Sequence, residues 1–182
     1  MTIWQHVPFE NEAAIGEWAR IRGITYRIIR CWENEPLEAD DLLVVLGGSM
    51  SAYDDIGFIK NEIEFLRKRI ESGGKIFGIC LGAQLLASAM GSRVYSSGTR
   101  EAGWRNIDLM PHPLTDSLDK TQFHFETTAE SMGKLLDADG EYLQSDSVFV
   151  ADTDTIQSEA HHIPTANKTL FELLDRWNQT LS

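Results

Sequence analysis

The stretch Lys75-Ile-Phe-Gly-Ile-Cys-Leu-Gly-Ala-Gln84 decides the fold of this 182-residue chain. Its first residues read as the end of a buried strand, and residues 81–90 read as a helix. Cys80 stands at the turn between them, flanked by Gly78 and Gly82. A nucleophile between glycines at a sharp strand-to-helix turn is typical of a nucleophile elbow, where the helix N-terminus favours a thiolate. Taken alone, the short motif fits a buried structural cysteine equally well.

A histidine that precedes a glutamate by two residues, in Gln122-Phe-His-Phe-Glu126, is the second signal. On an extended segment, His124 and Glu126 point to the same face, so the carboxylate can orient the imidazole. The imidazole can then face a thiol from elsewhere in the chain, as in Cys–His–acid catalysis. Without the other signals, an exposed strand face would explain this pair.

The third signal is the loop Gly47-Gly-Ser-Met-Ser51, which directly follows the apolar run Leu42-Leu-Val-Val-Leu46. The run predicts a buried strand. Two glycines at the carboxyl end of a strand allow backbone N–H groups to turn into a shared cavity, which suits an oxyanion hole. An ordinary glycine-rich connection is the alternative for this loop by itself.

The order of elements predicts an α/β fold with an open, mostly parallel central sheet and helices on both faces, as in flavodoxin. In such sheets the active site lies beyond the carboxyl ends of the strands. A small antiparallel region should follow the nucleophile helix. We expect strands at 2–7, 24–30, 41–46, 76–79, 93–95, 104–110 and 121–125, helices at 11–22, 59–71, 81–90, 127–137 and 167–177, and an irregular stretch at 140–159.

Composition limits the possible partners and compartment. The net charge of −12 argues against nucleic acid and anionic membranes as partners. No apolar run approaches a membrane span, and the N-terminus lacks the pattern of a secretory signal. A disulfide between Cys31 and Cys80 would remove the candidate nucleophile, so we expect both thiols to be reduced and the protein to be cytoplasmic.

The three signals, taken in their order along the chain, resemble the class I glutamine amidotransferase family, also called the triad family. Its pattern is an oxyanion loop of the type GG-x-x-S, then G-x-C-x-G-x-Q, then a late H-x-E. The resemblance extends over most of the chain, which looks like a stand-alone member similar to the amidotransferase domain of GMP synthetase. It implies one such domain over residues 1–182. Chance co-occurrence of three ordered motifs is improbable.

The resemblance implies hydrolysis of a γ-glutamyl amide through a Cys thioester, with release of ammonia or an amine and without a cofactor. It implies three groups of site residues: the catalytic Cys80, His124 and Glu126, the oxyanion-hole residues Gly48 and Leu81, and the substrate-binding residues Gly47, Met50 and Gln84. No metal site is expected, because the pair His161-His162 lacks further ligands at metal-binding spacing.

The acceptor of the ammonia stays open at this point. Three alternatives remain. The chain is a glutaminase that needs a synthetase partner, a free-standing γ-glutamyl peptide hydrolase, or a catalytically silent binding subunit with the same fold. Another family of cysteine-elbow proteins places a histidine soon after its cysteine. Here the first histidine after Cys80 is His112, which disfavours that family.

The interval before the late His-x-Glu is shorter than in the family. Members usually carry several dozen residues between the Gly-Trp strand, here Glu101-Ala-Gly-Trp104, and His124, whereas only Pro111–Lys120 occupy this interval. The match resumes abruptly at Gln122. We therefore expect the encoded protein to be longer, with a mobile pocket-lining segment missing between about 111 and 121; a true deletion is the alternative.

Overall fold

The computed structural model describes residues 1–108, 110–116, 118, 121–122, 124–138, 143 and 147–179. The chain divides into two compact units. Unit 1 comprises Met1–Glu12 and Ala19–Ser96, and unit 2 comprises Ala13–Trp18 and Ser97–Ser182. That residues 1–182 act as one domain stays a prediction.

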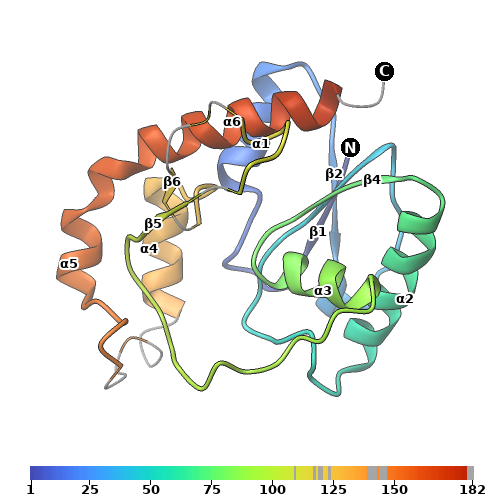
Figure 1. Cartoon of the computed structure of the whole chain (residues 1–182), viewed down its shortest axis with the longest axis horizontal. Coiled ribbons are helices and arrows are strands. Elements are labelled where there is room, and N and C mark those ends of the chain that lie inside the picture. The colour runs from blue at the N-terminus through green and yellow to red at the C-terminus, as the bar shows by residue number, and fades with distance from the viewer. Residues whose placement is uncertain are drawn as a thin grey trace. The chain divides into compact units, whose positions relative to one another are not determined.

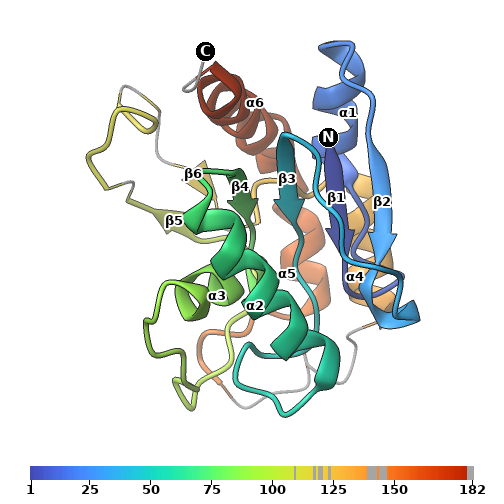
Figure 2. The same cartoon turned by 90° about the vertical axis from the view of Figure 1, so that its right-hand side faces the viewer.

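Four parallel strands form the sheet of unit 1 in the order β2-β1-β3-β4 (Figure 2). They are β1 (Thr2–Gln5), β2 (Arg27–Arg30), β3 (Leu42–Val45) and β4 (Lys75–Gly78). The central strands β1 and β3 are buried along their whole length, as expected for parallel strands covered on both faces. Because the strands are parallel, their carboxyl ends meet at one edge of the sheet, where the site motifs begin.

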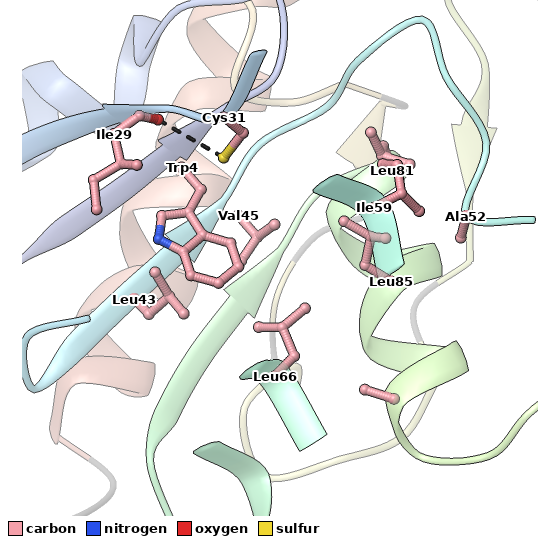
Figure 3. Close-up of a cluster of buried hydrophobic side chains, with 11 residues drawn as sticks. Trp4, Ile29, Cys31, Leu43, Val45, Ala52, Ile59, Leu66, Leu81 and Leu85 are labelled. Atoms are coloured by element: carbon pink, nitrogen blue, oxygen red, sulfur yellow. Dashed lines mark hydrogen bonds between the residues drawn. The ribbon is translucent and has the colours of Figure 1, made fainter. Parts of the chain in front are cut away.

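Helices α2 (Gly57–Glu71) and α3 (Leu81–Ala89) lie together on one face of this sheet (Figure 2). Alternation along the strands directs side chains such as Trp4 and Val45 toward them. Each such side chain contributes about 1.5–3 kcal/mol when fully buried. The buried cluster consists of Trp4, Ile29, Cys31, Leu43, Val45, Ala52, Ile59, Leu66, Leu81, Leu85 and Ala89 (Figure 3).

Glycines follow the ends of the first two helices. After α1 (Ala13–Ile21), Gly23 adopts φ of 66°, and the N–H of Ile24 donates to the Ala19 carbonyl at 2.9 Å. After α2, Gly73 adopts φ of 75°. Glycine reaches this left-handed conformation without the steric cost that a Cβ brings.

Unit 2 contains most of the remaining helices and the antiparallel pair β5–β6 (Figure 1). Its elements are β5 (Asn106–Ile107), β6 (Thr121–Gln122), α4 (Ala129–Ala138), α5 (Thr153–Ser158), the short 3-10 helix η2 (Ala160–His162) and α6 (Ile163–Gln179). A second 3-10 helix, η1 (Cys31–Glu33), follows β2 in unit 1. The predicted α/β class, with an open parallel sheet and a small antiparallel pair after the nucleophile helix, is confirmed.

Helix α4 begins with a cap close to the start of the helix expected at 127–137. The N–H of Ser131 donates to the Thr128 hydroxyl at 3.1 Å, and the N–H of Thr128 donates to the Ser131 hydroxyl at 2.8 Å. This reciprocal pair satisfies two N–H groups that a helix start leaves without partners.

Some predicted elements are wrong or shorter. Residues 93–95 form no strand: Tyr95 is exposed, and the Arg93 guanidinium lies over its ring at 5.3 Å. The strands expected at 104–110 and 121–125 are limited to β5 and β6, and Phe123 lies outside the described residues. The stretch 140–159, expected to be irregular, contains α5, because Asp152 caps it by accepting the Thr155 N–H at 2.7 Å.

Within the described residues, the longest helices are too short or too polar to cross a membrane. Both cysteines are free thiols; Cys31 is buried and Cys80 is half-buried.

Candidate active site

Cys80 occupies a strained turn between β4 and α3. Its backbone adopts φ of 49° and ψ of −111°, a region that residues with a side chain rarely enter. It directly precedes the helix, and the N–H of Gln84 donates to its carbonyl at 3.0 Å. Such a conformation costs about 1–3 kcal/mol and persists where the surrounding structure enforces it, most often at functional sites. The predicted nucleophile elbow is present.

The two glycines around Cys80 are enforced by close packing. A Cβ on Gly82 would lie 2.1 Å from the Val45 carbonyl oxygen, and one on Gly78 would lie 2.7 Å from the Gly82 carbonyl carbon. Side chains at either position would therefore push α3 away from the strands. This is the steric reason that the sequence pattern predicts.

The Gly47–Gly48 loop lies beside the elbow. A Cβ on Gly47 would lie 3.5 Å from the Cβ of Cys80, so the loop borders the nucleophile. A Cβ on Gly48 would lie 3.0 Å from the Cδ2 of Leu81, the first residue of α3. The structure thus brings together Cys80 and the two residues predicted to donate to an oxyanion; the donation itself stays a prediction.

Met50 and Gln84 both support this loop. The Met50 sulfur lies 3.2 Å from the position of a Cβ on Gly48, and its side chain packs against the core of unit 1. The Oε1 atom of Gln84 accepts the N–H of Ala52 at 3.4 Å, which ties α3 to the loop. The contact of Met50 and Gln84 with the substrate stays a prediction.

Glu10 is a neighbour of the loop that the sequence did not indicate. Its Oε2 atom lies 2.2 Å from where a Cβ on Gly47 would stand. The carboxylate therefore occupies the space that glycine leaves open at this position. It adds a negatively charged group to the side of the loop that borders Cys80.

His124 and Glu126 form a close pair in unit 2. The Nδ1 atom of His124 lies 2.7 Å from the Oε1 atom of Glu126, with 32% and 13% of the two side chains exposed. In Cys–His–acid sites the carboxylate holds this nitrogen, so that Nε2 exchanges the proton with the nucleophile. The predicted pairing of the two residues is confirmed, whereas their action on Cys80 stays a prediction.

The expectation of an extended segment at this pair is wrong. His124 adopts φ of 53°, and the N–H of Thr127 donates back to its carbonyl at 3.1 Å, so residues 124–127 form a turn. The two side chains meet because the chain reverses locally and not because strand residues alternate. Asn167 of α6 holds this turn by donating to the carbonyls of Phe125 and Thr127 at 2.8 and 2.9 Å.

His6 and Glu62 form a buried pair beneath the Gly47–Gly48 loop, and sequence reasoning missed both. The Nδ1 atom of His6 lies 3.0 Å from the Gly47 carbonyl oxygen, and its Nε2 atom lies 3.1 Å from the Oε2 atom of Glu62. Both side chains are 0% exposed. Two signals could have indicated them: a histidine directly after a buried strand, and a glutamate between the apolar residues Ile59 and Leu66 on one helix face.

Cys31 completes this buried cluster. The nitrogen, sulfur and oxygen atoms that His6, Cys31 and Glu62 offer all lie within 4.8 Å of one another, and all three are atom types that bind transition metals. Burial, followed by the nearby Glu62 charge, raises the pKa of the Cys31 thiol well above its ordinary range, so the thiol keeps its proton. The Sγ atom contacts the Ile29 carbonyl oxygen at 3.9 Å (Figure 3).

The profile of the family described as glutamine amidotransferase class-I matches residues 13–122. Together with the elbow, the glycine loop and the His–Glu pair, this match shows that the chain belongs to the class I glutamine amidotransferase family.

Individual relatives agree with this assignment. The putative glutamine amidotransferase-like protein YfeJ of Salmonella typhimurium is 33% identical over 122 residues, which are 60% of this chain and 51% of YfeJ. The GMP synthase (glutamine-hydrolyzing) of Aromatoleum aromaticum is 34% identical over 70 residues, which are 38% of this chain and 12% of that protein. The chain thus spans about half the length of YfeJ and far less of the synthase.

A solved structure shares the fold. The glutamine amido transferase from Methylobacillus flagellatus superposes with a TM-score of 0.91 at 22% sequence identity, over 100% of this chain and 95% of that chain. At this identity the similarity shows the common α/β fold.

Proposed function

We propose that the protein hydrolyses a γ-glutamyl amide, with free glutamine as the first candidate substrate, through a thioester on Cys80. The observation that carries the proposal is the strained elbow: Cys80 has φ of 49°, with the Gly47–Gly48 loop directly beside it. A nucleophile presented by a strained turn next to a pair of backbone donors suits acyl transfer.

In the proposed reaction, the Cys80 sulfur bonds to the carboxamide carbon while His124 accepts the thiol proton. Negative charge develops on the amide oxygen, where the N–H groups of Gly48 and Leu81 would stabilise it. His124 then passes the proton to the leaving nitrogen, the C–N bond breaks, and ammonia or an amine departs. Water cleaves the thioester, which releases glutamate and restores the thiol.

Glu126 has a supporting role in this scheme. Its carboxylate, 2.7 Å from the Nδ1 atom of His124, orients the ring and offsets the charge of the imidazolium. The mechanism requires His124 to reach Cys80 in the working enzyme. The support for that requirement is membership of a family with a cysteine–histidine–acid triad.

Two functions differ in whether a partner protein consumes the released ammonia. The match to a glutamine-hydrolysing GMP synthase supports a partner that consumes ammonia, whereas a free-standing enzyme would hydrolyse γ-glutamyl peptides without a partner. The free thiols Cys31 and Cys80 support a reducing compartment, and we propose the cytoplasm.

Ammonia release from glutamine, measured beside amine release from a γ-glutamyl dipeptide, tests the proposal. Cys80→Ser should abolish turnover, and an electrophilic glutamine analogue such as diazo-oxo-norleucine should label Cys80 alone. Cys31→Ser is the matched control, because the Cys31 thiol is buried whereas that of Cys80 is half-buried, and it should keep the activity. Full turnover in Cys80→Ser would exclude the thioester mechanism.

A further inference from the structure

We propose that His6 and Glu62 are positioning residues that set the direction of the Gly48 N–H group in the oxyanion hole. The proposal rests on the proposed function for its catalytic consequence. Three residues that follow neighbouring parallel strands carry it: His6 after β1, Gly47 after β3 and Cys80 after β4. All of them lie in unit 1 at the same edge of the sheet.

The geometry of one peptide bond links His6 to the candidate donor. The carbonyl of Gly47 and the N–H of Gly48 belong to the same planar peptide unit, and in a trans peptide they point in opposite directions. The described residues include no cis peptide bond, so this peptide is trans. The Nδ1 atom of His6 holds the Gly47 oxygen at 3.0 Å on the buried side. The Gly48 N–H is thereby directed to the opposite side of the loop.

This peptide needs an anchor because glycine flanks it on both sides. Two glycines allow the peptide plane to rotate with little steric resistance, so sequence alone does not select one orientation. His6 resists that rotation from a fixed position, since its side chain is 0% exposed and its Cβ lies 2.9 Å from the position of a Cβ on Gly48.

Hydrogen-bond chemistry determines where the protons lie. A carbonyl oxygen only accepts, so the Nδ1 atom of His6 must carry a proton and donate it to Gly47. One further proton then lies between Nε2 and the Glu62 carboxyl, 3.1 Å away. Glu62 thus fixes the plane of the imidazole ring, in the way that a carboxylate orients the histidine of a catalytic dyad.

Burial of the Glu62 carboxylate lowers the stability of the fold, so packing does not explain its presence. It projects from α2 into the core beside Ile59 and Leu66, and its Oε1 atom is buried without a hydrogen-bond partner among the described residues. An apolar residue of similar size would avoid this desolvation cost. A carboxylate at this position fits a role in holding His6.

A zinc ion held by His6, Cys31 and Glu62 is the competing interpretation. Tetrahedral zinc would bring the three ligand atoms to about 3.5 Å from one another. The three atoms all lie within 4.8 Å of one another, and the 3.1 Å between the Nε2 atom of His6 and the Oε2 atom of Glu62 is the distance of a hydrogen bond. The hydrogen-bonded pair is therefore favoured, and the zinc content of the protein becomes one outcome of the test.

The test compares two substitutions of His6 in the full chain. His6→Phe keeps the ring but removes both nitrogens, whereas His6→Asn places an amide donor near the position of Nδ1. We expect kcat for glutamine hydrolysis to fall about ten- to a hundredfold in His6→Phe, less than the 10²–10³ lost when a donor is removed outright. His6→Asn should recover most of this loss, and KM should change little in both.

Two controls separate positioning from general damage. Cys31→Ala removes the third side chain of the cluster without touching the Gly47 carbonyl, and its kcat should stay within about twofold. Alkylation of Cys80 by iodoacetamide forms no oxyanion, so its rate should be unchanged in every variant. A parallel loss of alkylation and hydrolysis would indicate a misfolded elbow and overturn the proposal.

A readout without substrate distinguishes failure of this proposal from failure of the proposed function. Hydrogen exchange of the peptide that covers residues 47–51 should be faster in His6→Phe than in wild type or Cys31→Ala. Faster exchange in a protein that hydrolyses neither substrate would refute the function and keep the positioning. Unchanged exchange together with unchanged kcat would overturn the positioning.

Two further outcomes are decisive. If His6→Phe does not fold, the same comparison is made with Glu62→Leu and Glu62→Gln. Gln can still form a hydrogen bond to the Nε2 atom of His6, whereas Leu cannot. Equal kcat in these two variants would contradict the role of Glu62. Stoichiometric zinc in the purified protein, lost in His6→Phe, would overturn the hydrogen-bonded pair.

Discussion

Cys80 and His124 share an unusual backbone conformation. Both have positive φ, 49° and 53°, although neither is glycine. Only two other described residues with a side chain do so, Ala13 and Asn34. Strain of this kind is retained where a side chain must be presented in one direction. It occurs here at both residues to which the family pattern assigns the chemistry.

Substitutions in the His–Glu pair should have unequal effects. His124→Ala removes the group that moves the proton, whereas Glu126→Gln keeps the shape of the side chain and removes only its charge. We expect His124→Ala to lower kcat for glutamine hydrolysis at least tenfold more than Glu126→Gln. Steady-state kinetics with both purified variants measures the ratio. Equal losses would show that Glu126 does more than orient the ring.

The buried Cys31 thiol should make the protein sensitive to alkali. Burial and the Glu62 charge raise its pKa above the ordinary value of 9.0, so the folded protein keeps a proton that the unfolded chain loses. Stability therefore falls as the pH rises above the unfolded pKa, by up to about 1.4 kcal/mol per pH unit.

Urea unfolding of wild type and Cys31→Ala, between about pH 8 and pH 10.5, isolates this contribution. The alanine variant loses packing at every pH but has no thiol to titrate. The difference in the free energy of unfolding between the two proteins should therefore shrink as the pH rises. A constant difference across this range would contradict the assignment.

At the scale of elements, the packing of α3 on the sheet depends on Gly82. A Cβ there would stand 2.1 Å from the Val45 carbonyl oxygen, which is backbone and cannot move aside easily. Gly82→Ala should lower the free energy of unfolding by about 2 kcal/mol or more, as overpacking does.

Gly133 offers a control of the opposite sign. It lies within α4, and a Cβ on it would meet nothing within 4 Å. Gly133→Ala should raise the free energy of unfolding by about 0.5–1 kcal/mol, because alanine favours the helix. Thermal or urea denaturation of both variants tests the pair of predictions. Destabilisation by Gly133→Ala would show that α4 is packed differently.

The Gly47–Gly48 loop should also be intolerant of a side chain at Gly48. A Cβ would lie 2.9 Å from the Cβ of His6 and 3.0 Å from the Cδ2 of Leu81, so the loop must shift. We expect Gly48→Ala to lower kcat by about 10²-fold, comparable to loss of one oxyanion donor, with little change in KM. Steady-state kinetics tests this, and an unchanged kcat would show that the loop is only a connector.

For the whole molecule, the mass of the natural protein tests whether a segment is missing near residues 111–121. From the family pattern we expect the interval Pro111–Lys120 to be shorter here than in other members. We predict that the natural protein is heavier than the 20.5 kDa of this sequence. Intact mass spectrometry of the protein from its source decides it, since a mass of 20.5 kDa would establish a true deletion.

Local pattern was sufficient for much of the fold. The strand-turn-helix around Cys80 and the Gly47–Gly48 loop depend on residues adjacent in sequence. Their steric requirements therefore appear directly as residue types at fixed spacing. The order of strands and helices likewise indicated a parallel sheet, because each helix returns the chain for the next strand.

Only the tertiary structure determines which residues hold the Gly47–Gly48 loop and the turn at His124 in place. The contact of His6 with Gly47 spans 41 residues and that with Glu62 spans 56, so local sequence can mark each residue but not their pairing. The turn at His124 depends on Asn167, 42 residues from the Phe125 carbonyl to which it donates. Backbone groups and buried polar side chains can take partners from any part of the chain. Only the folded arrangement selects which partner each one has.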